Sequence, residues 1–106
     1  MGKLHYDGAS IDIDDRVLAH LQIVIVNRLR RKEGFLMSWL NTLAMGDGRG
    51  SVWLDHAIPL RFTFSGSRAP HINSDWIAAL EKSAGSPTGL LVLGEDGRLT
   101  RCTSAR

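Results

Sequence analysis

The stretch SIDIDDRVLAHLQIVIVNRLRRKEGFLMSWL, residues 10–40, decides the fold. It begins with alternating polar and apolar residues, which is typical of a strand exposed on one side. Asp14 or Asp15 then predicts a helix N-cap, and a helix should run from about Arg16 to Lys32. Gly34 suits the position just past the helix end. Residues 35–40 are almost continuously apolar, which predicts a central strand covered on both faces.

The predicted helix has apolar residues on two sides. The stripe expected to pack on a sheet consists of Val17, Leu18, Leu21, Val24, Ile25 and Leu29. Ala19, Ile23 and Val26 fall on the far side, where a surface helix should be polar. Either the helix is covered on two sides within the chain, or these three residues form an oligomer interface, and we favour the interface.

Strands flank this region on both sides. Upstream, residues 3–6 and 10–13 predict a hairpin with a turn at Asp7-Gly8. Downstream, residues 51–54 and 60–64 follow the strand at 35–40 with short turns between them, which favours an antiparallel meander. Alternation in the last of these strands predicts that Leu60, Phe62 and Phe64 face inward.

The remaining elements complete the predicted fold. Asn73 or Ser74 caps a second helix over residues 75–83, and residues 88–93 predict a final strand. The order β-β-α-β-β-β-α-β gives an α+β domain over residues 1–93, with a mainly antiparallel sheet and two helices on one face. Residues 94–106 form either a basic tail or a short extra strand.

Composition limits the class of protein. The chain of 106 residues suits one domain, and its 13 Lys and Arg against 11 Asp and Glu give a net charge of only +2. A single cysteine, Cys102, forms no internal disulfide and fits a reducing cytoplasm, where we expect the protein to be located. No apolar run reaches the roughly 18–20 residues of a membrane helix, so we expect no membrane partner.

The basic residues are clustered rather than spread. Residues 16–32 carry no acid, and their cations include Arg28, Arg30, Arg31 and Lys32. Such a cluster could contact phosphates of a nucleic acid. Alternatively, the cations complement the negative end of the helix dipole, and the residues alone favour this second explanation.

A second set of residues suits nucleic-acid recognition. Trp53 lies on the opposite side of its strand from Val52 and Leu54, so we expect it to be exposed. With Arg49, Arg61 and Arg68, an exposed tryptophan could stack on bases while the cations hold phosphates. Ser67 and Arg68 also stand in a loop leading to the second helix, where they could hold one anion.

Catalysis and metal binding find little support. The four histidines are far apart in the sequence and none has zinc-site spacing with another ligand. We expect no metal, cofactor or catalytic residue. Catalysis is the least favoured of the functional hypotheses, because no sequence motif links the candidate catalytic groups Asp55, His56 and His71.

Several motifs spread over residues 1–92 resemble those of a known family. They include Asp14-Asp15-Arg16, Leu29-Arg30-Arg31, Ser38-Trp39, Gly48-Arg49, Trp53-Leu54, Gly66-Ser67-Arg68 and Trp76-Ile77. In combination they look like a family of small actinobacterial proteins of unknown function. Its members often carry the inherited label "ATP-dependent DNA ligase".

The residues do not support ligase activity. Such ligases attach AMP to the lysine of a K-x-D-G motif. Here Asp7-Gly8 follows His5-Tyr6, and the segment 94–97 also lacks lysine. We therefore expect a non-enzymatic binding module associated with nucleic acid. The alternative is a self-associating module, such as a homodimer, that binds no nucleic acid.

Overall fold

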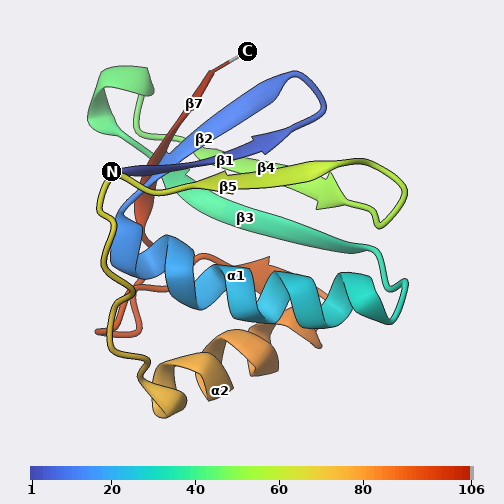
Figure 1. Ribbon diagram of the computed structural model, residues 1–106. Helices are drawn as coiled ribbons and strands as arrows, with labels where there is room; N and C mark the ends of the chain where they lie inside the picture. Colours follow the sequence, from blue (N-terminus) through green and yellow to red (C-terminus); the bar gives the residue numbers. More distant parts are fainter. Residues whose placement is uncertain (106) are drawn as a thin grey trace.

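The computed structural model describes residues 1–105 and confirms a single small α+β domain. Figure 1 shows its sheet above two helices. In chain order the elements are β1 (Gly2–Tyr6), β2 (Ala9–Ile13), α1 (Asp15–Arg30), β3 (Phe35–Asn41), the short 3-10 helix η1 (Leu43–Met45), β4 (Arg49–Leu54), β5 (Leu60–Thr63), α2 (Ser74–Ala84), β6 (Leu90–Leu91) and β7 (Arg101–Ala105).

The first hairpin and the start of α1 form as predicted. The turn residues Asp7 and Gly8 have φ angles of 49° and 80°, the two left-handed positions of a type I′ turn. Asp14 is the N-cap of α1, because its carboxylate accepts hydrogen bonds from the backbone amides of Arg16 (3.1 Å) and Val17 (3.4 Å). The side chain of Asp15 is therefore not needed as a cap.

The end of α1 corrects the role expected for Gly34. The helix ends at Arg30, and the left-handed residue beyond it is Lys32, with a φ of 60°. Gly34 instead makes room for an aromatic ring, since a Cβ atom there would lie 3.0 Å from the side chain of Trp53. The glycine is thus required by packing and not by the helix end.

The strand order β4-β3-β7-β2-β1-β5 shows that the predicted meander is wrong. β3 and β4 pair as expected, but β5 pairs with β1 at the opposite edge of the sheet. The backbone amide of Asp55, just after β4, donates to the Tyr6 hydroxyl (3.1 Å), which ties the chain to β1 at this point. Alternation along β5 fixes which side is buried but does not specify the partner strand.

The last strands differ from the prediction as well. The strand expected at 88–93 is reduced to β6, which pairs with β3. β7 enters the sheet between β3 and β2, parallel to β3 and antiparallel to β2, so the sheet is mixed. Cys102 of β7 is fully buried, and burial raises the pKa of its thiol to about 12.

The two faces of the sheet have different roles. Both helices lie on one face, with α2 packed on α1 and β6 (Figure 1). The predicted stripe of α1 is confirmed: its first five members are buried, and Leu29 packs against the same core. Leu60 and Phe62 also pack against the core, whereas Phe64 lies beyond the end of β5 and is 36% exposed, contrary to expectation.

His20 is the one buried polar side chain in the described part of the chain. Its Nε2 accepts a hydrogen bond from the backbone amide of Asn73 (3.0 Å), so its Nδ1 carries the proton donated to the Arg16 carbonyl (2.7 Å). The ring stacks on Trp76 at a centroid distance of 4.1 Å. His20 therefore connects α1 to the start of α2.

Candidate functional site

The helix-free face of the sheet carries three of the predicted site residues. Trp53 and Arg49 share this side of β4, because alternate residues of a strand point the same way. Arg61 lies on the outer side of β5, since Leu60 and Phe62 turn into the core. Because β5 is at the opposite edge of the sheet from β4, Arg61 borders a separate depression with His5 and Ser10. Trp53 is 59% exposed, as predicted, and both arginines are exposed.

A depression of about 800 Å³ runs over this face from β4 across β3 to β6. The register places Ser51 beside Ser38 and Ser38 beside Leu91, so its floor mixes hydroxyl and aliphatic groups. Arg49 borders the depression, and Trp53 lies further along β4. At a rise of about 3.3 Å per residue, the two are roughly 13 Å apart along the strand.

The Trp53 ring is held in place by its neighbours. The ring lies against Gly34, and Trp53 is opposite Leu36 in the pairing of β4 with β3. Gly34 belongs to the short connection from α1 to β3 that also contains Lys32. The exposed ring is therefore next to the basic end of α1.

The positive charge on this face is only partly neutralised. Lys3 pairs with Asp12 (2.6 Å) and Arg101 pairs with Asp47 (2.7 Å). Arg49 and Arg61 form no ion pair with any residue between 1 and 105. These two arginines are available to an external anion.

The cluster at the end of α1 divides into paired and unpaired cations. Glu33 contacts Arg28 (3.2 Å) and Arg31 (3.3 Å), and Glu81 of α2 lies 4.0 Å from Arg28. The unpaired members, within the described chain, are Arg30 and Lys32. These two are therefore the cations of the cluster without an acidic partner in the described chain.

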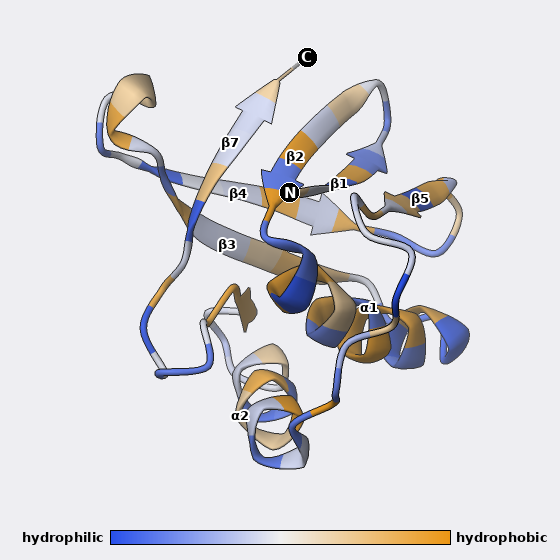
Figure 2. Ribbon diagram, turned by 60° about the vertical axis from the view of Figure 1, so that its left-hand side comes forward, coloured by the Kyte–Doolittle hydropathy of each residue, from blue (hydrophilic) through white to orange (hydrophobic). Residues whose placement is uncertain are grey.

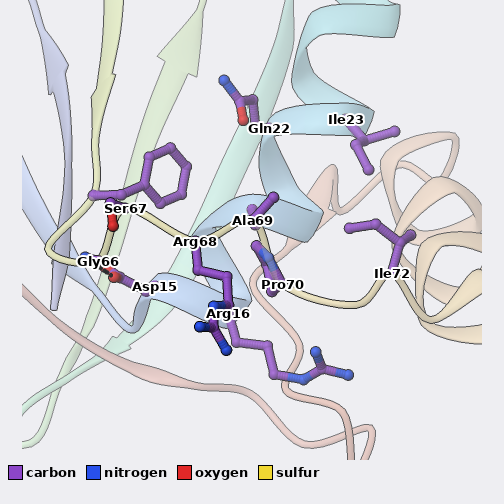
Figure 3. Close-up of a pocket in the computed structure, with 12 residues that line it drawn as sticks. Asp15, Arg16, Gln22, Ile23, Gly66, Ser67, Arg68, Ala69, Pro70 and Ile72 are labelled. Carbon is purple, nitrogen blue, oxygen red and sulfur yellow. Dashed lines mark hydrogen bonds between the residues drawn. The ribbon is translucent and has the colours of Figure 1, made fainter.

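Ser67 and Arg68 lie elsewhere, in a groove on the outside of α1. The groove has a volume of about 460 Å³ and runs between α1 and the loop from Phe64 to Ile72. Its α1 wall includes Ala19 and Ile23, two of the residues predicted for self-association. Figure 3 shows Ile23 on this wall. Val26, the third, is half-buried and does not line it.

The structure thus supplies α1 with a second cover from its own chain. The 64–72 loop faces one part of the helix, and α2 packs on another. Ala19 is only 8% exposed, so its apolar character is explained without a second molecule. In Figure 2 the middle of α1 is largely hydrophobic and this loop passes beside it.

The loop is fixed by hydrogen bonds at both ends. The Asp15 carboxylate accepts from the backbone amides of Ser65 (3.1 Å) and Gly66 (2.9 Å), and these bonds lower its pKa. At the other end, the Arg16 guanidinium donates to the His71 carbonyl (2.7 Å), beside the bond from Asn73 to His20. The groove is therefore formed in the free protein.

Arg16 is itself held by an acid from a distant turn. Its Nε and Nη2 donate to the two carboxylate oxygens of Glu95 (3.1 and 2.7 Å), and its guanidinium lies 5.6 Å from the Trp76 ring centroid. Asn73 donates to the same carboxylate (2.9 Å). Hydrogen bonds from Arg16 and then Asn73 lower the pKa of Glu95 to about 2.

Comparison with known proteins identifies a family whose function is unknown. Residues 1–95 match the model of a family described as a domain of unknown function, DUF7882. The chain belongs to this family. No curated protein and no solved structure matches the sequence.

The sequence alone missed the polar network that shapes the groove. Its members are Asp15, Arg16, His20, Asn73 and Glu95. One signal was present: His20 falls within the apolar stripe of α1, three residues after Val17 and four before Val24. A polar residue at such a position predicts a buried hydrogen bond.

The DUF7882 domain offers no arrangement for metal chemistry among residues 1–105. No group of three His, Cys, Asp or Glu side chains there is placed to hold an ion. Asp55 and His56 form an exposed pair with each other (3.1 Å). No helix in the same residues is long and apolar enough to span a membrane.

Proposed function

We propose that this protein is a non-enzymatic module that binds single-stranded nucleic acid on the helix-free face of its sheet. The observation that carries the proposal is Trp53, which is 59% exposed on the side of β4 that also presents Arg49. A tryptophan costs free energy when left in water, and stacking on a base would remove that exposed area.

The charges around Trp53 fit a chain of phosphates. Arg49 lies on one side of it along β4, and Lys32 precedes Gly34, on which the ring packs. An unstacked single strand could place one base on Trp53 and adjacent phosphates on these cations. Ser38 and Ser51 in the depression would then donate to base edges or sugar hydroxyls.

This role would be accessory rather than catalytic. The resemblance to proteins labelled as ligases is compatible with nucleic-acid binding. Neither Asp7-Gly8 nor Asp96-Gly97 has the lysine of an adenylation motif two residues before its aspartate.

The proposal is tested by measuring the affinity of the full chain for single-stranded DNA and RNA across salt concentrations. We expect binding at low salt that weakens as salt rises, with a slope reporting the phosphates contacted. Absence of binding at low salt, or a dissociation constant independent of salt, would overturn the proposal.

Matched variants separate stacking from charge. Trp53→Ala should weaken binding by about 1–3 kcal/mol, while Trp53→Phe should retain most of it. Arg49→Gln should reduce the salt slope by about 0.7, the value for one phosphate of a single strand. Arg98→Gln, at an exposed turn residue outside the depression, is the control and should change neither quantity.

A further inference from the structure

The groove beside α1 is mainly apolar and has the guanidinium of Arg68 at one end. Ala19, Ile23, Phe64 and Ile72 supply apolar walls. Phe64 is 36% and Ile72 is 48% exposed, so the groove leaves large hydrophobic surfaces open to water. Figure 3 shows Arg68 pointing towards Arg16 and the start of α1, with Gln22 and Ile23 away from that end.

The other charged groups at the Arg68 end of the groove have partners of their own. Arg16 is neutralised by Glu95, through two hydrogen bonds to its carboxylate. Asp15 stays ionised, because backbone amides stabilise its carboxylate, and the N-terminal ammonium lies 3.9 Å away. The acids at this end are already bound, Asp14 and Asp15 by backbone amides and Glu95 by Arg16 and Asn73. Arg68 makes no ion pair with any residue from 1 to 105, so its guanidinium is left for an external carboxylate.

The loop that borders the groove is attached to α1 at both ends. The contacts are with Asp15 at one end and with Arg16 and His20 at the other. Pro70 restricts the backbone between these attachments. A volume of about 460 Å³ falls within the range of small-molecule sites.

We propose that the groove binds a small amphipathic carboxylate with a single negative charge. The apolar body would lie along Ala19, Ile23 and Ile72, and the carboxylate would accept hydrogen bonds from Arg68. Ser67 supplies a hydroxyl on the same loop.

The test is a titration of the full chain with decanoate, followed by amide chemical shifts and calorimetry. Decanol and decylammonium, with the same apolar chain, are the matched ligands. We expect saturable binding of decanoate that shifts amides of residues 64–72 and of the first half of α1. Decanol should bind about tenfold more weakly, because it lacks the charge-assisted hydrogen bond, and decylammonium should bind no better than decanol.

Arg68→Gln should weaken decanoate binding about tenfold and leave decanol binding unchanged. Arg98→Gln is the charge-matched control and should leave both unchanged. Ile23→Asp should abolish binding of both ligands, provided that its circular dichroism is native.

Three outcomes would overturn the proposal. In the first, decanoate gives no saturable shifts in the groove. In the second, decanoate and decanol bind equally well, which would make the groove a purely apolar surface. In the third, the same amides shift with protein concentration in the absence of ligand, which would identify a second copy of the chain as the occupant.

Discussion

Replacement of His20 by alanine should strongly destabilise the packing of α2 on α1. The change leaves the part-buried backbone amide of Asn73 without its acceptor and removes the ring stacked on Trp76. An unsatisfied buried donor costs about 1–3 kcal/mol, and the aromatic pair contributes roughly 0.5–1.5 kcal/mol. We therefore expect a loss of about 2–4 kcal/mol in the free energy of unfolding.

Urea denaturation followed by circular dichroism measures this loss directly. For a domain of this size the melting temperature should fall by roughly 10–25 °C. His20→Leu retains much of the volume and should fall between the wild type and His20→Ala. Asn27→Ala, at an exposed position of α1, is the control and should stay within about 0.5 kcal/mol of the wild type. A similarly small effect for His20→Ala would refute the reasoning.

Three further predictions concern packing, pH and thiol chemistry. Gly50→Ala places a Cβ atom 2.6 Å from the Trp39 ring and should cost about 1–3 kcal/mol in urea denaturation, whereas Gly48→Ala, whose nearest contact is 3.6 Å, should cost less. Because the pKa of Glu95 is lowered from 4.5 to about 2, its contribution to stability is complete above pH 4.5 and is lost as the pH falls towards 2. Glu95→Gln should therefore flatten the stability profile in that range, and an unchanged profile would contradict the role of the Arg16 pair. Cys102, with a pKa raised to about 12, should react with a thiol reagent only at the rate of unfolding, and rapid labelling of the native protein would show that it is accessible.

Local signals in the sequence predicted the first hairpin, a cap of α1 at Asp14 or Asp15 and the buried stripe of α1, because turns, caps and helical periodicity depend on neighbouring residues. The partners of β5 and β7 could not be predicted in the same way. The alternation of β5 is compatible with pairing to β4 or β1, and RCTSA, the sequence of β7, has little apolar character for a strand between two others.

In the candidate site, too, the features set by local sequence were predictable and those set by long-range contacts were not. The exposure of Trp53 followed from alternation in one strand, and Arg49 shares its side for the same reason. The groove depends instead on Asp15 binding Ser65 and Gly66, fifty residues or more away in the sequence. Such a contact leaves no periodic signal, so Ala19 and Ile23 appeared as a free apolar surface.

The most direct test of the nucleic-acid proposal is a map of amide chemical shifts on adding a short single-stranded oligonucleotide at low salt. We predict that the largest changes fall on β4 and β3 around Trp53, Ser51 and Ser38, with quenching of Trp53 fluorescence. Changes confined to the α1 and α2 side of the sheet, or no changes at all, would contradict the proposal.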